Sequence, residues 1–210
     1  MCRMKQQFAS QLLQVGAVKL RPAEPFTWAS GWKSPIYCDN RQLLSYPEIR
    51  SFVKHSLVEL CRLHFPDAEV VAGVATGAIA QGALVADELG LPFVYVRPKP
   101  KDHGMQNLIE GRLEAGRRVV VVEDLISTGG SSLKAVEAIR QQGCEVAGMV
   151  ASFTYGFPVA ERAFAEAGVK LCTISDYEAV VVEAAKAGYV DAADLETLAR
   201  WRRQPEAWNR

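Results

Sequence analysis

The sequence predicts an α/β protein in which helices flank a parallel β-sheet, with a smaller α/β layer at the N-terminus. From about residue 69, short apolar runs alternate with helical patterns, which is typical of βαβ units with right-handed crossovers. One run, R-R-V-V-V-V-E-D-L (residues 117–125), is rich in β-branched side chains, as expected for a strand buried on both faces. Residues 1–68, called the hood below, lack this alternation and contain short extended pieces instead.

The elements follow from these patterns in chain order. In the hood, we expect a helix at residues 5–13 and a long helix that begins near Ser45, where S-Y-P-E matches a capping box with proline in the first turn. Between the two helices, extended pieces are expected at 18–20, 26–29 and 35–38. Residues 69–176 are expected to form the core, with strands at 69–74, 91–96, 117–125, 146–154 and 169–174 and helices at 77–89, 131–143 and 158–167.

Two segments complete the chain. Residues 97–116 show no periodicity and predict a long loop. Helical patterns at 177–187 and 194–203 predict C-terminal helices within residues 177–210. Because no repeat or Pro/Gly/Ser-rich linker divides the sequence, residues 1–210 are expected to form a single domain.

Composition excludes several classes of partner. The 24 Lys and Arg residues balance 24 Asp and Glu, so no overall charge attracts nucleic acid or an anionic membrane. No apolar run is long enough to span a bilayer, and residues 1–14 lack the continuous apolar core of a signal peptide. The five cysteines are scattered without a C-x-x-C pair, which argues against disulfides or structural zinc. We therefore expect a cytoplasmic protein that binds neither nucleic acid nor membrane.

The segment V-V-V-V-E-D-L-I-S-T-G-G-S-S, residues 119–132, carries the clearest chemical signal. Ligands of parallel sheets bind beyond the carboxyl ends of strands, and main-chain N–H groups at a helix N-terminus attract anions. Gly129 and Gly130 allow a close backbone approach that a Cβ would block. The segment therefore predicts a phosphate cradle, although it is neither a Walker A loop nor a G-x-G-x-x-G motif.

Glu123 and Asp124 stand directly before this cradle. Two carboxylates would repel a phosphate unless they contact neutral or cationic groups, and sugar hydroxyls with a divalent metal nearby meet that requirement. A ribose that carries a phosphate is the simplest ligand. The alternative, a βα turn whose acids only cap the next helix, does not explain the whole contiguous pattern.

Basic side chains cluster in the predicted loop: Arg97, Lys99, Lys101 and His103. Cations of this kind would stabilise a departing pyrophosphate, and a closing lid would exclude water from the reacting carbon. His103 could supply a proton or a hydrogen bond. A solvated basic loop is the alternative.

The strand, acid pair and T-G-G turn resemble the signature of the type I phosphoribosyltransferases. The resemblance implies a fold like theirs and the substrate 5-phosphoribosyl 1-pyrophosphate (PRPP), with Mg²⁺ as cofactor and no direct side-chain ligand to the metal. Glu123 and Asp124 would hold the ribose hydroxyls. The remaining PRPP contacts would fall on the cradle: Leu125, Ile126, Ser127, Thr128, Gly129, Gly130 and Ser131. V-A-T-G-A, residues 74–78, resembles the family's pyrophosphate-binding turn.

R-x-x-x-K-D-H-G, residues 97–104, is similar to the catalytic loop of the orotate phosphoribosyltransferases, a branch of this family. In that branch the loop reaches across a homodimer into the neighbouring active site. The resemblance implies that Arg97, Lys101 and His103 bind PRPP, and that Lys101, His103 and Asp124 are catalytic.

F-T-W-A-S-G-W-K-S-P-I-Y-C-D-N-R, residues 26–41, resembles the segment that holds orotate in the same branch. It implies orotate contacts at Tyr37 and Cys38, together with Ser127. Some relatives carry a Lys before S-G and an Arg after the fourth core strand, where this chain has Ala29 and Tyr155. The implied reaction converts orotate and PRPP into orotidine 5′-monophosphate and pyrophosphate in pyrimidine (UMP) biosynthesis.

Two alternatives share the cradle. A purine-base phosphoribosyltransferase would use the same PRPP site with another acceptor. A PRPP-sensing regulator of this fold would need a nucleic-acid-binding module or a basic face, and the neutral charge argues against one.

Overall fold

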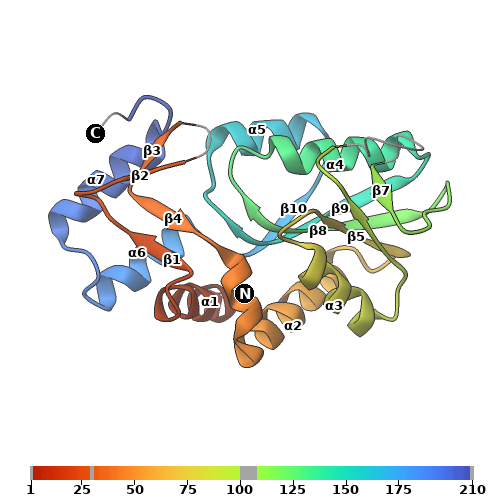
Figure 1. Ribbon diagram of the computed structural model, residues 1–210, viewed down its shortest axis with the longest axis horizontal. Helices are drawn as coiled ribbons and strands as arrows, with labels where there is room; N and C mark the ends of the chain where they lie inside the picture. Colours follow the sequence, from red (N-terminus) through yellow and green to blue (C-terminus); the bar gives the residue numbers. More distant parts are fainter. Residues whose placement is uncertain (1, 29–30, 100–107, 209–210) are drawn as a thin grey trace.

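The computed structural model describes residues 2–28, 31–99 and 108–208. Its centre is a six-stranded sheet in the order β10-β9-β8-β5-β6-β7 (Figure 1). The strands are β5 (Val70–Val74), β6 (Phe93–Val96), β7 (Ile109–Glu110), β8 (Arg118–Ile126), β9 (Glu145–Thr154) and β10 (Leu171–Asp176). All neighbouring pairs are parallel except β6 and β7. The predicted fold class, a parallel sheet flanked by helices, is confirmed.

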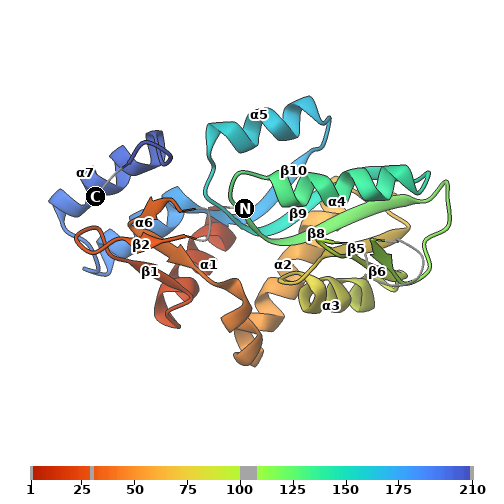
Figure 2. The ribbon, with the colours of Figure 1, turned by 45° about the horizontal axis from the view of Figure 1, so that its top comes forward.

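Helices cover both faces of this sheet. Helices α2 (Pro47–His64) and α3 (Ile79–Leu89) lie on one face, and α4 (Gly130–Gln141) and α5 (Pro158–Glu166) lie on the other (Figure 2). Successive side chains of a strand point to opposite faces, so β8 supplies both cores. Val120 and Val122 belong to the core on the α2 side, whereas Val119 and Val121 belong to the core on the α4 side. This double burial explains the uninterrupted valine run.

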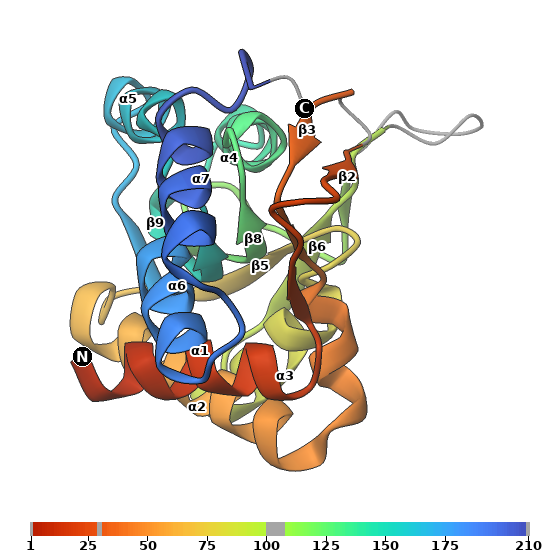
Figure 3. The same ribbon diagram turned by 90° about the vertical axis from the view of Figure 1, so that its left-hand side faces the viewer.

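The hood contributes helix α1 (Cys2–Gln14), two short antiparallel strand pairs and a 3₁₀ helix, η1 (Asn40–Ser45). Strand β1 (Val18–Leu20) pairs with β4 (Ile36–Cys38), and β2 (Phe26–Thr27) pairs with β3 (Lys33–Ser34). Helices α6 (Tyr177–Lys186) and α7 (Ala192–Arg203) lie at the same end of the molecule as β2 and β3 (Figures 1 and 3). The C-terminal helices therefore help to support the N-terminal strands.

The predicted capping box at Ser45 is wrong. Ser45 closes η1, and α2 begins two residues later at Pro47, with Tyr46 in the cap position and no side-chain cap hydrogen bond. The residue before a proline favours extended backbone, and Tyr46 adopts φ −112° and ψ 98°. Pro47 thus moves the start of the helix away from the serine.

The predicted long loop at 97–116 contains a short strand. Its second half contains β7, which pairs with β6, and the N–H of Arg97 donates to the carbonyl of Leu108 at 2.7 Å. A strand of two residues leaves no periodicity to detect, so the pattern could not predict it. Residues 100–107 lie outside the described part of the chain. Of the helices that the structure describes, none is long and apolar enough to cross a membrane.

Candidate functional site

The candidate site lies at the carboxyl ends of β5 and β8. These strands are neighbours, yet the helices that follow them, α3 and α4, cover opposite faces of the sheet. A crevice forms at such a topological switch point, because the two crossovers leave it in opposite directions. The fold therefore places the turn after β5 beside the acid pair and cradle after β8.

Glu123 is held by hydrogen bonds inside this crevice. Its side chain accepts from Ser132 Oγ at 2.8 Å and from the main-chain N–H of Asp124 at 3.0 Å, and only 4% of the residue is exposed. Burial raises the pKa of Glu123 well above its usual range, and the neighbouring charge of Asp124 raises it further.

Asp124 is half-buried and faces the turn after β5. Burial raises the pKa of its carboxyl group, while a hydrogen bond with Glu123 and the positive charge of Arg41 oppose that rise. A Cβ at Gly77 would overlap the Asp124 carboxylate. Glycine at this position therefore lets the acid pair and the β5 turn form one continuous surface.

The cradle presents the N-terminus of α4. Gly129, at φ +82°, occupies the cap position, and no side chain of the described residues caps this helix. Its first N–H groups are therefore available to an anion, and the helix dipole favours negative charge there. A Cβ built on Gly130 would meet nothing within 4 Å, so space remains for a ligand beside the backbone.

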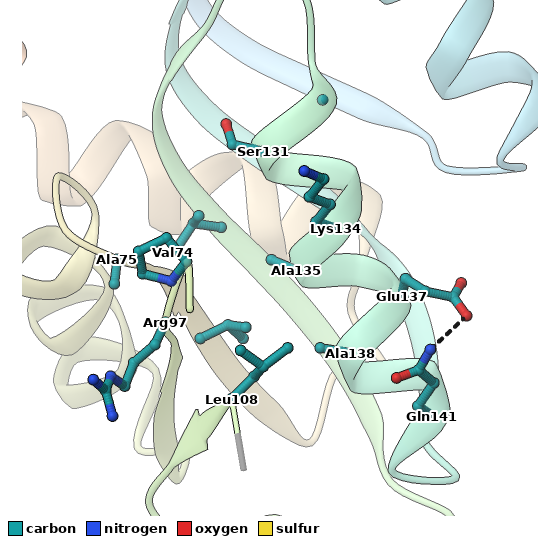
Figure 4. A pocket seen from close by; sticks show the side chains of 13 residues that line it. Val74, Ala75, Arg97, Leu108, Ser131, Lys134, Ala135, Glu137, Ala138 and Gln141 are labelled. Atoms are coloured by element: carbon teal, nitrogen blue, oxygen red, sulfur yellow. Dashed lines mark hydrogen bonds between the residues drawn. The ribbon is translucent and has the colours of Figure 1, made fainter. Parts of the chain in front are cut away.

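A cavity of about 500 Å³ extends from the cradle across the sheet. Ala75, Arg97 and Ser131 line it above an apolar floor that includes Val74 and Leu108. Figure 4 shows Lys134 of α4 on the wall opposite Arg97. Arg97 also pairs with Glu110 across β6 and β7, with Nη1 3.4 Å from Oε1. Lys134 carries no signal in the sequence beyond its position one helical turn after Gly130 and Ser131.

The hood reaches the acid pair through Asn40. Asn40 Nδ2 donates to the main-chain carbonyl of Asp124 at 2.6 Å, and Asn40 Oδ1 accepts from Cys38 Sγ at 3.4 Å. Only 7% of Asn40 is exposed. The role of Asn40 could not be predicted from the sequence, because its partner is 84 positions away and the local signal is only a polar D-N-R triplet after β4.

A family comparison decides the identity of this fold. The model of the phosphoribosyl transferase domain matches residues 42–186, which include β5, the acid pair and the cradle. The chain belongs to the phosphoribosyltransferase family. The type I fold implied by the sequence motifs is thereby confirmed.

Curated relatives and solved structures agree with this assignment. An orotate phosphoribosyltransferase of Bacteroides fragilis is 62% identical over 99% of this chain and 98% of its own, and one of Porphyromonas gingivalis is 63% identical over 95% of both chains. The crystal structure of orotate phosphoribosyltransferase from Aeropyrum pernix superposes with a TM-score of 0.76 at 33% identity, covering 88% of this chain and 99% of that one. Leishmania donovani UMP synthase gives a TM-score of 0.80 at 25% identity, covering 95% of this chain and 42% of that longer one.

The phosphoribosyltransferase site brings together most of the residues singled out in the sequence. The acid pair, the cradle residues and Arg97 lie at the carboxyl ends of the neighbouring strands β5, β6 and β8: Glu123, Asp124, Ser127, Thr128, Gly129, Gly130, Ser131 and Arg97. Of these, Arg97, Gly130 and Ser131 line the cavity. Ile126 is fully buried, so it could meet a ligand only through its backbone, and Leu125 packs partly against the core. Lys101 and His103 lie outside the described residues.

In the hood, Tyr37 is 38% exposed and its ring centroid lies 5.6 Å from that of Phe26. Cys38 is buried, and burial raises the pKa of its thiol. Cys38 can therefore offer its main chain, rather than its sulfur, to a ligand.

The donor set suits a magnesium ion that arrives with PRPP. No three His, Cys, Asp or Glu side chains gather into a metal site within the described ranges. Mg²⁺ retains several waters and binds through substrate phosphates and one or two carboxylates, and a half-buried Asp124 beside the phosphate cradle fits that pattern.

We predict that the phosphoribosyltransferase becomes less stable as pH rises, and that Glu123→Gln weakens this dependence. Because the pKa of Glu123 is raised in the folded state, folding retains a proton there that the unfolded chain releases above about pH 4.5. Stability therefore falls as pH climbs from that value through the higher folded-state pKa. Glutamine carries no charge and should flatten this part of the curve. Thermal unfolding between about pH 5 and pH 8 measures the effect.

Glu59→Gln, on the exposed face of α2, provides the control and should keep the wild-type slope. Parallel curves for the wild type and Glu123→Gln would show that Glu123 does not hold this proton.

Proposed function

We propose that this phosphoribosyltransferase transfers the 5-phosphoribosyl group of PRPP to orotate. The products are orotidine 5′-monophosphate and pyrophosphate, and the step belongs to pyrimidine biosynthesis. One observation carries the proposal: the acid pair stands at the switch point directly beside an uncapped helix N-terminus, so one crevice offers carboxylates to sugar hydroxyls and N–H groups to a phosphate. Relatives about 62% identical over nearly the whole chain are named for this activity.

Different residues of the chain would bind the ribose and the 5′-phosphate of PRPP. Glu123 and Asp124 would accept hydrogen bonds from the ribose 2′- and 3′-hydroxyls. Residues 127–131 would hold the 5′-phosphate at the start of α4. Ser132 keeps the Glu123 carboxyl oriented, and Gly77 lets Asp124 approach the turn after β5. The ribose is thereby fixed with its anomeric carbon facing the hood.

In the reaction, the bond from the anomeric carbon to the pyrophosphate oxygen breaks as a bond from the orotate ring nitrogen forms. Orotate attacks as its nitrogen anion, so its proton has already passed to solvent and no protein base is needed. Negative charge grows on the departing pyrophosphate, where Arg97, Lys101 and His103 would stabilise it. Bound Mg²⁺ would neutralise part of the same charge. Positioning and electrostatics thus account for catalysis.

The assay follows orotate absorbance with purified protein, PRPP and Mg²⁺. Consumption of orotate that depends on PRPP supports the proposal. Well-folded protein that leaves orotate unchanged, or that uses adenine or hypoxanthine instead, would contradict it.

We further propose a cytoplasmic homodimer in which the 97–116 loop of each subunit serves the partner's site. The cysteines whose side chains are described, Cys38, Cys61, Cys144 and Cys172, are all free, as expected in a reducing compartment. Mixing Lys101→Ala protein with Asp124→Asn protein tests the sharing. Hybrid dimers would carry one site with both residues intact, so activity should reappear after subunit exchange; mixtures as inactive as their components would exclude a shared loop.

We expect Lys101→Ala to lower kcat by about 30-fold while changing both KM values much less. A cation on a leaving pyrophosphate acts mainly in the transition state, and one charge-assisted hydrogen bond contributes about 2 kcal/mol. Steady-state kinetics with orotate and PRPP separates the two parameters. Lys19→Ala, on the exposed side of β1, is the control. Equal losses for the two variants would remove Lys101 from the catalytic set.

A further inference from the structure

Orotate carries a carboxylate, and a cation beside the base would favour it over neutral rings. This inference rests on the proposed function. The end of β9 does not supply such a cation. Tyr155 follows this strand and is 2% exposed, with its ring stacked on Phe157 at 5.4 Å and 12°. Its hydroxyl group belongs to the packed interior, and burial raises its pKa well above the usual range. The cation must come from elsewhere.

Arg41 stands at the place where the hood meets the ribose site. It follows Asn40, whose side chain is hydrogen-bonded to the Asp124 carbonyl at 2.6 Å. Neighbouring Cα atoms are about 3.8 Å apart, so this bond keeps the Arg41 backbone near the main chain of Asp124. Consistent with that placement, the positive charge of Arg41 lowers the pKa of Asp124, and the negative charge of Asp124 raises the pKa of Arg41.

The guanidinium of Arg41 is held at one end and open at the other. Asp39 Oδ1 accepts from the Arg41 main-chain N–H at 3.2 Å and from Nε at 2.7 Å. The two terminal amino groups make no hydrogen bond to any described residue, and 58% of the side chain is exposed. Asp39 therefore orients a donor fork whose outer pair of N–H groups remains available, and such a fork matches a carboxylate with two parallel hydrogen bonds.

We propose that Arg41 binds the carboxylate of orotate and makes the enzyme selective for an acidic pyrimidine over neutral bases. In this arrangement Tyr37 borders the ring, Arg41 receives its charged substituent, and Asp124 holds the ribose toward which the ring nitrogen points. Asp39 is a positioning residue that acts through Arg41. The selectivity arises in the hood rather than in the cradle.

The test compares Arg41→Gln and Arg41→Lys with Arg117→Gln. Arg117 is a matched control, because it is also exposed and paired with carboxylates, Glu69 and Glu114, at the amino end of β8. Steady-state kinetics gives KM for orotate and for PRPP, and inhibition by uracil, which lacks the carboxylate, measures discrimination between acidic and neutral rings.

Arg41→Gln should raise KM for orotate by about 10- to 100-fold, with KM for PRPP within about threefold of wild type. Uracil inhibition should stay nearly constant, so the preference for orotate over uracil falls. Arg41→Lys should recover part of the loss, and Arg117→Gln should resemble wild type. An unchanged KM for orotate, or equal rises for orotate, PRPP and uracil, would overturn the proposal. Wild-type protein that does not turn over orotate would instead overturn the proposed function.

Discussion

Replacing Asp124 with asparagine should lower kcat/KM by about 100- to 1,000-fold without unfolding the protein. Positive charge develops at the anomeric carbon as pyrophosphate leaves, and Asp124 is the acid of the pair that is half-buried and open to the crevice. Asparagine keeps the shape that packs against Gly77 but loses the negative charge that the transition state needs. Steady-state kinetics with both substrates measures the loss.

The melting temperature of Asp124→Asn distinguishes a catalytic role of Asp124 from a structural one. The charge of Asp124 raises the pKa of Glu123, in a crevice where burial already raises the pKa values of both acids. Removing the Asp124 charge should therefore keep or increase the melting temperature. Asp67→Asn is the control, since Asp67 is exposed and pairs with Arg118 at the other end of β8. Near-normal activity of Asp124→Asn, or a joint loss of activity and melting temperature, would contradict the assignment.

The central sheet and the cradle could be predicted because their signals are local. The valine run of β8 reports burial on two faces, and the acids, glycines and hydroxyls that follow it are contiguous. A contiguous pattern of this kind predicts the same local structure in any fold that buries the strand. The strand, its acids and the following helix could therefore be predicted together.

Contacts between distant segments could not be predicted in the same way. The hydrogen bond between Asn40 and Asp124 joins residues 84 positions apart, and the sequence around either residue does not indicate the other as its partner. Likewise, Trp201 lies in a segment that was predicted only as a C-terminal helix, and Tyr155 was noted only because some relatives have an arginine there. In the structure both belong to one aromatic cluster that joins α7, the hood and the end of β9. Long-range packing of this kind depends on the fold as a whole.

This cluster leads to the second large effect, because Trp201 is its centre. The residue is fully buried, and its Nε1 donates to the main-chain carbonyl of Lys33 in the hood at 3.1 Å. Its ring contacts four others with centroids 5.4–5.9 Å away: Trp28, Tyr155, Phe157 and Tyr177. Trp28 in turn comes from the hood, Tyr155 and Phe157 follow β9, and Tyr177 begins α6. One side chain therefore connects three separate parts of the chain.

We expect Trp201→Ala to destabilise the protein by about 3–5 kcal/mol and to lower the melting temperature by roughly 10 °C. Truncation leaves a cavity among rings that cannot easily collapse, and it frees the Lys33 carbonyl. Trp201→Phe should lower the free energy of unfolding by only about 1 kcal/mol beyond the cost of the smaller buried area. The ring contacts persist in this variant, and only the hydrogen bond is lost. Trp208→Ala, at a partly buried position beyond α7, is the matched control and should cost less.

Trp201→Ala should affect orotate binding at the hood more than PRPP binding at the cradle. Trp201 supports the strands that lead to Tyr37 and Arg41, whereas the PRPP contacts rest on β5, β8 and α4. At a temperature where Trp201→Ala remains folded, KM for orotate should therefore rise more than KM for PRPP. The two KM values could rise together, or Trp208→Ala could be equally destabilising. Either result would show that Trp201 does not couple the C-terminal helix to the orotate side of the site. The hood would then be held by its contact with Asp124 and by its packing on the sheet.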